Sequence, residues 1–439
     1  MKFSIIFFRY KTLLMVSAIC LMWTACSVDT ILDPNNPSAD GIIQNASLGE
    51  IQNLVDGTES SMRDNLNNYF DGVNVIGREY YRFSTSDPRF TSDLLGKASA
   101  VLDNNTFYTT NPFAARYRAV KNTNILIDAL TNTKATISDA QRKAAIGYAK
   151  TLQAHELLMV LNEQYANGIR VDVKDPAKLG PFLTKDESLT AIVALLNEAN
   201  IDLKGNAALL PFSSTIYGGD GNTFSKFNRA VAARAYVYKK DWAAANTALT
   251  ESFFELTGDL NKGAFYIFST AGGDQLNPLY YPQNSSGETR VAHPSFVTNA
   301  EAGDNRLNKV SLRASAEFQD GLSSTYDFFV YKTNADKIPI IRNEELILLY
   351  AEVQAQLNQN VNAVTAINRI RVSANLPVYS GAVTQAALIN EILKQRLYSL
   401  YGEGHRWIDL RRYDRLVQLP IDRTGDDVWT EFPRPATEQ

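Results

Sequence analysis

The chain has 439 residues, of which 45% are hydrophobic, so it can bury a large core and shows no sign of large-scale disorder. Its formal net charge is −4 and it contains no basic run, which argues against nucleic acid as a partner. Aromatic residues are plentiful, with 21 Tyr and 21 Phe but only 4 Trp. The chain therefore has many rings to place in a core or in a binding site.

Residues 1–25 are predicted to be a lipoprotein signal peptide that is removed from the mature protein. Lys2, Arg9 and Lys11 give this segment a positive start. The apolar stretch that follows, 13–23, is shorter than the roughly 20 residues that a membrane-spanning helix needs. The segment is therefore excluded from the fold prediction.

Cys26 is the predicted site of lipidation. Thr24 and Ala25 before it resemble a lipobox, in which the thiol is acylated and the cysteine becomes the first residue after cleavage. The only other cysteine, Cys20, lies in the removed segment, so no intramolecular disulfide can form after cleavage. Acyl chains such as palmitate would anchor the protein firmly, at about 0.8 kcal/mol per buried methylene. Residues 26–40 then have the turn chemistry of an extended, lipidated tether.

Stretches with apolar residues at three- and four-residue spacing predict a mostly α-helical fold. They are 48–67, 116–130, 141–164, 186–200, 226–251, 344–371 and 386–401. Two of them contain a short polar turn, at 241–242 and at 358–360, with small residues such as Ala233 and Ala355 for close helix crossings. This pattern is typical of tetratricopeptide-like hairpins. Because each hairpin leaves an apolar face that only a neighbour can cover, we expect the hairpins to stack into a superhelical slab.

Two stretches, 65–113 and 255–337, are predicted as loop-rich insertions. Gly, Pro, Asn, Asp, Ser and aromatic residues are frequent in the first of them. The insertions break the fixed period of the hairpins, which argues against a simple scaffold solenoid. We therefore expect a single domain over residues 41–439, in which both insertions pack on one side of the helical repeats.

The motifs of common enzymes are missing. His155 and Glu156 begin a zinc-helix pattern that lacks its second histidine, and the glycine-rich stretch 218–222 lacks the flanking strand and helix of a phosphate loop. We therefore expect no enzymatic activity and no cofactor. The sequence leaves open whether a calcium ion supports one of the loops.

The stretch 398–413, YSLYGEGHRWIDLRRY, joins two predicted helices near the end of the chain. Glu403, His405 and Asp409 in it could be metal ligands or an acid–base set. However, they alternate with core-type residues such as Trp407 and Leu410. This favours the alternative, a buried ion-pair network at a helix junction.

The same stretch resembles the C-terminal signature of the SusD/RagB family, approximately E-R-x-x-E-L-x-x-E-G-x-R-W-x-D-L-x-R. The matching residues are Arg396, Leu400, Glu403, Gly404, Arg406, Trp407, Asp409, Leu410 and Arg412. Gln395 and Ser399 replace glutamates of the pattern, so we expect one or two ion pairs to be missing. Residues 117–124, 363–377 and 432–438 resemble further family segments, whereas 165–168 departs from the family pattern.

The resemblance implies a nutrient-binding lipoprotein of the outer membrane that faces the cell exterior. Such a protein would capture an oligosaccharide and deliver it to a SusC-like TonB-dependent transporter. The alternatives are capture of an oligopeptide, or a non-catalytic helical-repeat scaffold that holds partner proteins at the cell surface. A scaffold should expose an apolar groove along its hairpins, whereas a capture protein should have an aromatic pocket in its insertions.

The binding residues of the family come from the two insertions, which contain the residue types that bind sugars. Aromatic rings stack on sugar C–H faces, while Asn, Asp and Arg supply directional hydrogen bonds. The candidates are Tyr80, Tyr81, Arg82, Phe83, Asp87, Tyr108, Tyr280, Tyr281 and Asn284. Alternatively, these rings fill the core beneath long loops. Trp242, Trp407 and Trp429 lie outside both insertions, so wide indole platforms are missing there and a peptide ligand stays open.

Overall fold

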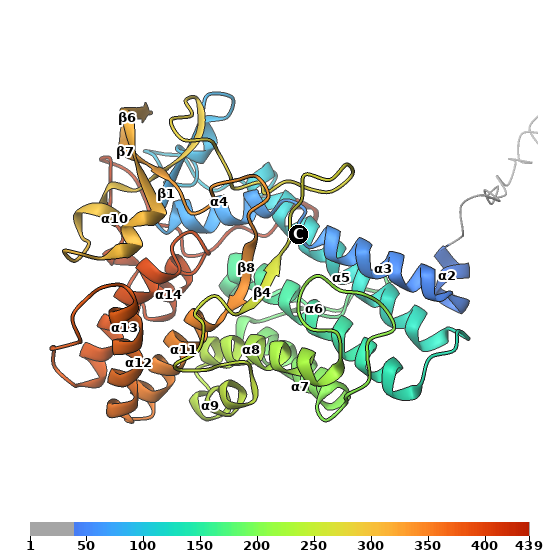
Figure 1. The fold of residues 1–439 in the computed structure, drawn as a ribbon. Coiled ribbons are helices and arrows are strands. Elements are labelled where there is room, and N and C mark those ends of the chain that lie inside the picture. Colours follow the sequence, from blue (N-terminus) through green and yellow to red (C-terminus); the bar gives the residue numbers. More distant parts are fainter. Residues whose placement is uncertain (1–38, 439) are drawn as a thin grey trace, which may run out of the picture. The chain divides into compact units, whose positions relative to one another are not determined.

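Helices form most of the part of the chain that the structure, a computed structural model, describes: residues 39–438 (Figure 1). The predictions for the signal peptide, for Cys26 and for most of the tether lie outside these residues. The chain divides into residues 1–42 and residues 43–439, and helix α2 (Ala39–Asn45) contains the boundary.

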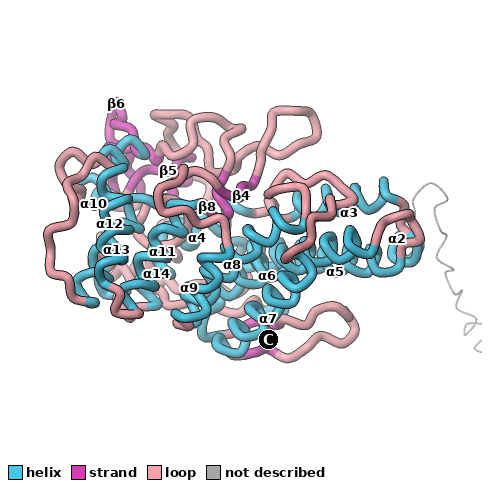
Figure 2. Tube along the Cα trace, turned by 60° about the horizontal axis from the view of Figure 1, so that its bottom comes forward, coloured by secondary structure: helices cyan, strands magenta, loops and turns pink. Residues whose placement is uncertain are grey.

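Consecutive helices pack against one another along the chain, as a tetratricopeptide-like fold requires (Figure 2). They are α3 (Leu48–Ser61), α5 (Phe107–Asn132), α6 (Asp139–Gln164), α7 (Lys185–Leu203), α8 (Gly221–Lys239), α9 (Trp242–Glu251), α11 (Asn343–Gln356), α12 (Asn360–Ser373) and α13 (Gln385–Ser399). Both predicted hairpins, α8 with α9 and α11 with α12, are confirmed, and α11 contacts α8 and α9 to join the two. None of the helices in the described part combines the length and the apolar character that crossing a membrane requires.

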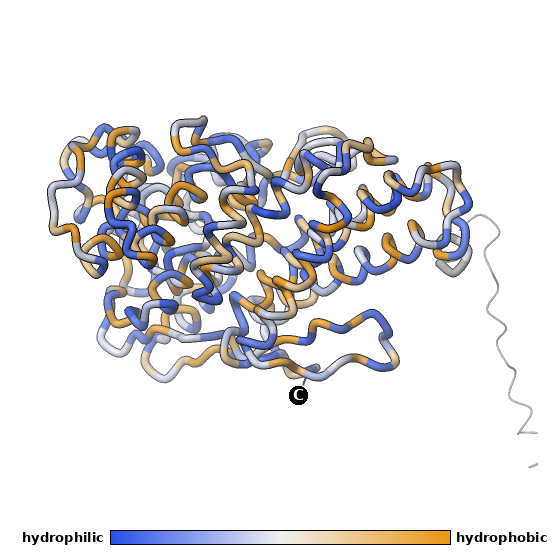
Figure 3. Tube along the Cα trace, turned by 90° about the horizontal axis from the view of Figure 1, so that it is seen from below, coloured by the Kyte–Doolittle hydropathy of each residue, from blue (hydrophilic) through white to orange (hydrophobic). Residues whose placement is uncertain are grey.

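Small residues allow the helices to approach closely. A Cβ at Gly147 of α6 would lie 2.7 Å from Leu203 Cγ and 2.9 Å from the Ala199 carbonyl oxygen, both on α7. In α11 and α12, Ala351 and Ala363 are fully buried in one hydrophobic cluster with larger aliphatic side chains. Apolar and polar residues alternate along the same helices (Figure 3). Each helix therefore buries one face against its neighbours, and this burial stabilises the stack.

The insertions contain more regular structure than the sequence predicted. The first contains α4 (Leu66–Ile76), β1 (Tyr80–Ser84) and the short helix η1 (Pro88–Phe90). The second contains β4 (Gly263–Tyr266), β5 (Glu288–Ala292), α10 (Pro294–Thr298), η3 (Asn305–Lys309), β6 (Val310–Gln319) and β7 (Leu322–Phe328). Moreover, α5 begins at Phe107 rather than near residue 116, because burial of Tyr108 and Phe113 outweighs the low helix propensity of this stretch.

One sheet joins the two insertions. Its strand order is β1-β5-β7-β6, and β1 pairs antiparallel with β5. Two smaller sheets pair β4 with β8 (Ile338–Arg342) and β2 (Ile169–Arg170) with β3 (Phe182–Leu183). In Figure 1, β6 and β7 lie at the top left, away from α7, α8 and α9 at the bottom. The body of the protein is therefore helical, and the larger sheet belongs to the insertions.

The predicted ion-pair network at the C-terminal junction is confirmed. Asp409 of α14 (Arg406–Arg412) accepts from Arg396 Nε at 2.5 Å and from Arg412 Nη2 at 2.8 Å. Glu403 pairs with Arg342 at 2.7 Å. The Arg396 Nη1 and Nη2 atoms are buried without a hydrogen-bond partner.

Candidate functional site

Strands β1 and β5 align polar side chains from both insertions on one face of the sheet. Arg82 lies opposite Arg290, and Ser84 lies opposite Glu288. Since side chains alternate between the two faces of a strand, Tyr81 and Phe83 point the other way, where their rings stack at 5.6 Å. The sheet thus has one charged face and one apolar face at this position.

Arg82 is the centre of a hydrogen-bonded group that we call the Arg82 cluster: Arg82, Ser84, Ser86, Tyr281 and Glu288. Arg82 Nη2 donates to the Tyr281 hydroxyl at 2.9 Å and to Glu288 Oε2 at 2.6 Å. Glu288 Oε1 accepts from Ser84 Oγ at 2.7 Å and from Ser86 Oγ at 2.8 Å. Burial alone would raise the pKa of Glu288, but these hydrogen bonds lower it to about 2. The glutamate is therefore ionised at neutral pH.

The Tyr281 ring is half-buried and lies close to two guanidinium groups. The Cζ atoms of Arg82 and Arg290 each lie 5.1 Å from its centroid. Arg290 is held in turn by Asp71 of α4, at 2.6 and 2.7 Å. These contacts fix the orientation of the ring and leave part of it exposed, which suits a stacking surface for a ligand.

Four predicted binding residues instead lie in the core. Tyr80, Tyr81, Phe83 and Tyr108 are all buried, with at most 3% of their surface exposed. The Tyr80 hydroxyl donates to Asp71 Oδ1 at 2.8 Å, which places this ring directly behind the Arg82 cluster. Their positions match the alternative interpretation, in which the rings fill the core beneath the loops. We correct the prediction accordingly: these four residues support the surface rather than form it.

Four other predicted residues reach the surface. Asp87, Tyr280 and Tyr281 are partly exposed and Asn284 is exposed. Asn284 adopts a left-handed conformation (φ 60°), and its Oδ1 accepts from the Ala314 amide at 2.7 Å, which ties the loop to β6. Arg82 is mostly buried but contacts both Tyr281 and Glu288. The structure thus brings Arg82 and Tyr281 together, one from each insertion.

Several residues of this region were not predicted from the sequence. Glu288, Arg290 and Asp71 are needed to hold Arg82 and Tyr281, yet Arg82 and Glu288 are 206 positions apart. Arg89 was also missed: its guanidinium lies 5.0 Å from the Phe107 centroid, and its side chain is 45% exposed. Only knowledge of the β1–β5 pairing would have pointed to Glu288.

Within residues 39–438, no three His, Cys, Asp or Glu side chains are grouped so that they could hold a metal ion. Of the predicted alternative set, Glu403 and Asp409 are engaged by arginines, as described above. His405 is buried, and desolvation lowers its pKa to about 4. These residues have structural roles.

Comparisons with known proteins agree with this architecture. The family model described as "SusD family" matches residues 235–434. The SusD-like protein P38 of Formosa agariphila is 32% identical over 145 residues, which cover 30% of this chain but only 29% of that protein's length.

Two solved structures resemble nearly the whole chain. A SusD superfamily protein from Bacteroides vulgatus matches with a TM-score of 0.69 at 15% identity, and the match covers 89% of this chain and 96% of that protein's chain. Surface glycan-binding protein A from Bacteroides thetaiotaomicron has a TM-score of 0.69 at 17% identity, covering 90% and 97% respectively. At these identities the likeness establishes the fold.

Proposed function

Since residues 235–434 match the family model described as "SusD family", we propose that this chain is a surface lipoprotein of that family, which captures an oligosaccharide and delivers it to a SusC-like TonB-dependent transporter of the outer membrane. The name of the structural relative from Bacteroides thetaiotaomicron, a surface glycan-binding protein, supports this ligand class. Capture requires a binding surface and a moving complex but no covalent step, so the proposed role is not enzymatic.

The N-terminal region supplies the anchor in this proposal. Cleavage after residue 25 leaves Cys26 to carry the lipid, and residues 26–40 tether the binding domain, 41–439, to the membrane. Acyl chains on one cysteine and its amino group are sufficient for stable attachment. A lipid-anchored protein needs no spanning helix.

The observation that carries the proposal is the joining of both insertions by β1 and β5, with the half-buried Tyr281 ring held close to the guanidinium groups of Arg82 and Arg290. We assign Tyr280, Tyr281, Asn284 and Asp87 to direct ligand contact because these side chains reach the surface. Arg82 acts as a positioning residue for Tyr281. A sugar ring stacked on Tyr281 would find hydroxyl-binding groups on Glu288 and Asn284 nearby.

A second candidate ligand is an oligopeptide, which the charged residues of the site favour. The Arg82 cluster contains an arginine and a glutamate, which could pair with charged peptide groups. Neither of the two tryptophans nearest the C-terminus takes part: Trp407 is fully buried, and the Trp429 indole donates to the Asp93 carbonyl at 2.8 Å. Both ligand classes would use the same surface.

The test is calorimetric titration of the full-length protein in detergent with panels of oligosaccharides and of oligopeptides. We expect an oligosaccharide to bind and Tyr281→Ala to weaken it by about tenfold, since an aromatic contact contributes about 1 kcal/mol beyond area burial. Tyr379→Ala, in the loop between α12 and α13, is the matched control and should bind as the unmodified protein does. Binding that survives Tyr281→Ala unchanged would exclude this surface, and binding of peptides alone would favour the second candidate.

A further inference from the structure

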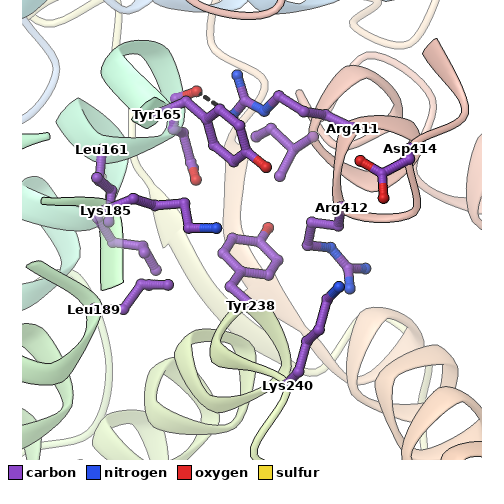
Figure 4. A pocket seen from close by; sticks show the side chains of 12 residues that line it. Leu161, Tyr165, Lys185, Leu189, Tyr238, Lys240, Arg411, Arg412 and Asp414 are labelled. Atoms are coloured by element: carbon purple, nitrogen blue, oxygen red, sulfur yellow. Dashed lines mark hydrogen bonds between the residues drawn. The ribbon is translucent and has the colours of Figure 1, made fainter. Parts of the chain in front are cut away.

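A cavity of about 240 Å³ lies among the ends of four helices and shares no residue with the Arg82 cluster. Its walls come from the end of α6, the start of α7, the end of α8 and α14 (Figure 4). Leucine and isoleucine side chains form its apolar part, and Tyr165 and Tyr238 contribute two rings. The volume is below the roughly 300–1,000 Å³ of typical sites for drug-sized ligands, so it suits a single small group.

Cationic side chains dominate the lining. Lys185, Lys240, Arg411 and Arg412 all line the cavity, whereas Asp414 is the one carboxylate in the lining. Arg412 is neutralised by Glu352 at 2.7 Å and by Asp409 at 2.8 Å. With Arg412 paired in this way, Lys185, Lys240 and Arg411 face a single lining carboxylate, Asp414, so the lining has a net positive charge.

Arg411 is a buried cation that forms no salt bridge among residues 39–438, although the nearby Glu431 carboxylate favours its charged form. Only 3% of its surface is exposed. Two of its nitrogens donate to the carbonyl oxygens of Thr430 and Asn162, both at 2.6 Å, while Nε has no partner. Its guanidinium lies 4.0 Å from the Tyr165 centroid and 4.2 Å from that of Trp407. A desolvated guanidinium without a salt bridge is stabilised when an anion binds beside it.

The two lysines can also reach an anion. Lys185 Nζ lies 5.1 Å from the Tyr165 centroid, and its ion pair is with Asp186, whose side chain is 83% exposed. Lys240 forms no ion pair among residues 39–438. Exposed pairs such as that of Lys185 contribute little and exchange easily with other anions. Figure 4 shows Lys185 on one side of the cavity and Lys240 on another, with Tyr238 between them.

We propose that this cavity binds the carboxylate or sulfate group of an acidic sugar, with Arg411, Lys185 and Lys240 as the cationic contacts and the Tyr165 and Tyr238 rings beside the sugar ring. Both groups present negatively charged oxygens, which suit guanidinium and ammonium donors. The naming of a sugar rests on the proposed function, whereas the anion site itself does not. The burial of Arg411, which lowers its pKa to about 10, leaves it cationic at neutral pH.

The first test uses sodium sulfate alone, titrated into the full-length protein at constant ionic strength. We expect sulfate to bind to the unmodified protein. The double variant Lys185→Gln/Lys240→Gln should weaken the binding of sulfate by about tenfold, because each substitution removes a positive charge near the anion. Lys226→Gln removes an exposed charge at the other end of α8 and should bind sulfate as the unmodified protein does. Circular dichroism confirms that the variants are folded. An unmodified protein that binds no sulfate, or a double variant that binds it equally well, would overturn the proposal.

The second test compares glucuronate, glucose 6-sulfate and glucose. We expect at least one of the acidic sugars to bind more tightly than glucose, and the tighter one identifies the anion. Equal binding of all three would overturn the assignment to an acidic sugar. These outcomes are independent of Tyr281→Ala, so failure of the anion site is distinguishable from failure of the capture surface.

Discussion

At the scale of single residues, the insertions show why a buried tyrosine and an exposed one can belong to the same site. Tyr281 presents part of its ring to solvent, and Tyr80 holds the Asp71 carboxylate that binds Arg290 beneath that ring. Because a buried carboxylate needs its donors, the loss of the Tyr80 contact should cost stability, whereas the two hydrogen bonds from Arg290 still hold Asp71 in place. The two tyrosines therefore contribute to the site in different ways.

Tyr80→Phe tests this division of roles. Removing the hydroxyl takes one donor from Asp71, so we expect the free energy of unfolding to fall by about 1–2 kcal/mol. Ligand affinity should stay within about twofold, because Arg290 still binds Asp71 through two hydrogen bonds. Urea denaturation and ligand titration measure the two quantities. A variant of unchanged stability that no longer binds ligand would show that Tyr80 contacts the ligand itself.

At the scale of secondary-structure elements, close helix crossings and buried charges hold the helices together. Gly147 lets α6 approach α7, and Glu79, between α4 and β1, accepts from the Gly402 amide at 3.0 Å. The second oxygen of Glu79 is buried without a partner. Burial raises the pKa of Glu79 to about 8, against the weaker opposing effects of this hydrogen bond and of Arg406. The first insertion is thus linked to the C-terminal signature through a carboxyl group that is mostly protonated at neutral pH.

Gly147→Ala should destabilise the protein by about 1–3 kcal/mol, because the added methyl group would overlap Leu203 and the Ala199 carbonyl. The matched control is Gly57→Ala in α3, where the added methyl group meets nothing within 4 Å. That control should stabilise the protein by about 0.5–1 kcal/mol, since alanine is the better helix former. Thermal denaturation of both variants checks the pair. Equal effects would mean that the α6–α7 crossing is not tight.

Glu79→Gln tests the pH dependence of stability. A carboxyl group with a raised pKa in the folded state stabilises fully below its unfolded pKa, about 4.3, and progressively less as pH rises toward its folded pKa. With a folded pKa of about 8, the unmodified protein should therefore lose stability between pH 5 and 8 through this group. The variant should lose less over the same interval, as urea midpoints at several pH values would show. Identical slopes would contradict the assignment.

At the scale of the whole molecule, local patterns predicted the helical body, and long-range pairing determined the site. The hairpin of α8 and α9 follows from its alanine spacing and from Asp241, whose side chain caps α9. Helix α4 was missed because Asn67, Asn68 and Gly72 disfavour an isolated helix, and burial outweighs this preference. The cationic cavity was not predicted either, since Lys185, Lys240 and Arg411 come from different parts of the chain.

The same reasoning explains which candidate residues could be identified. The aromatic composition of 65–113 and 255–337 indicated the two segments that the sheet joins. It could not distinguish Tyr80 from Tyr281, because Tyr80 is buried where β1 packs against Asp71 of α4, whereas Tyr281 lies in the loop before β5 and stays partly exposed. Likewise, Glu288 gains its role only when β5 lies beside β1. Composition thus located the region, and strand register selected its residues.

The central claim, that the two joined insertions form the ligand-binding surface, is tested most directly by hydrogen–deuterium exchange of the full-length protein with and without its captured ligand. We predict that ligand slows amide exchange in and around β1 and in the loop with Tyr280, Tyr281 and Asn284, while the α11–α12 hairpin is unchanged. Protection confined to the helical hairpins, with no change in either insertion, would contradict the account and favour the interaction scaffold.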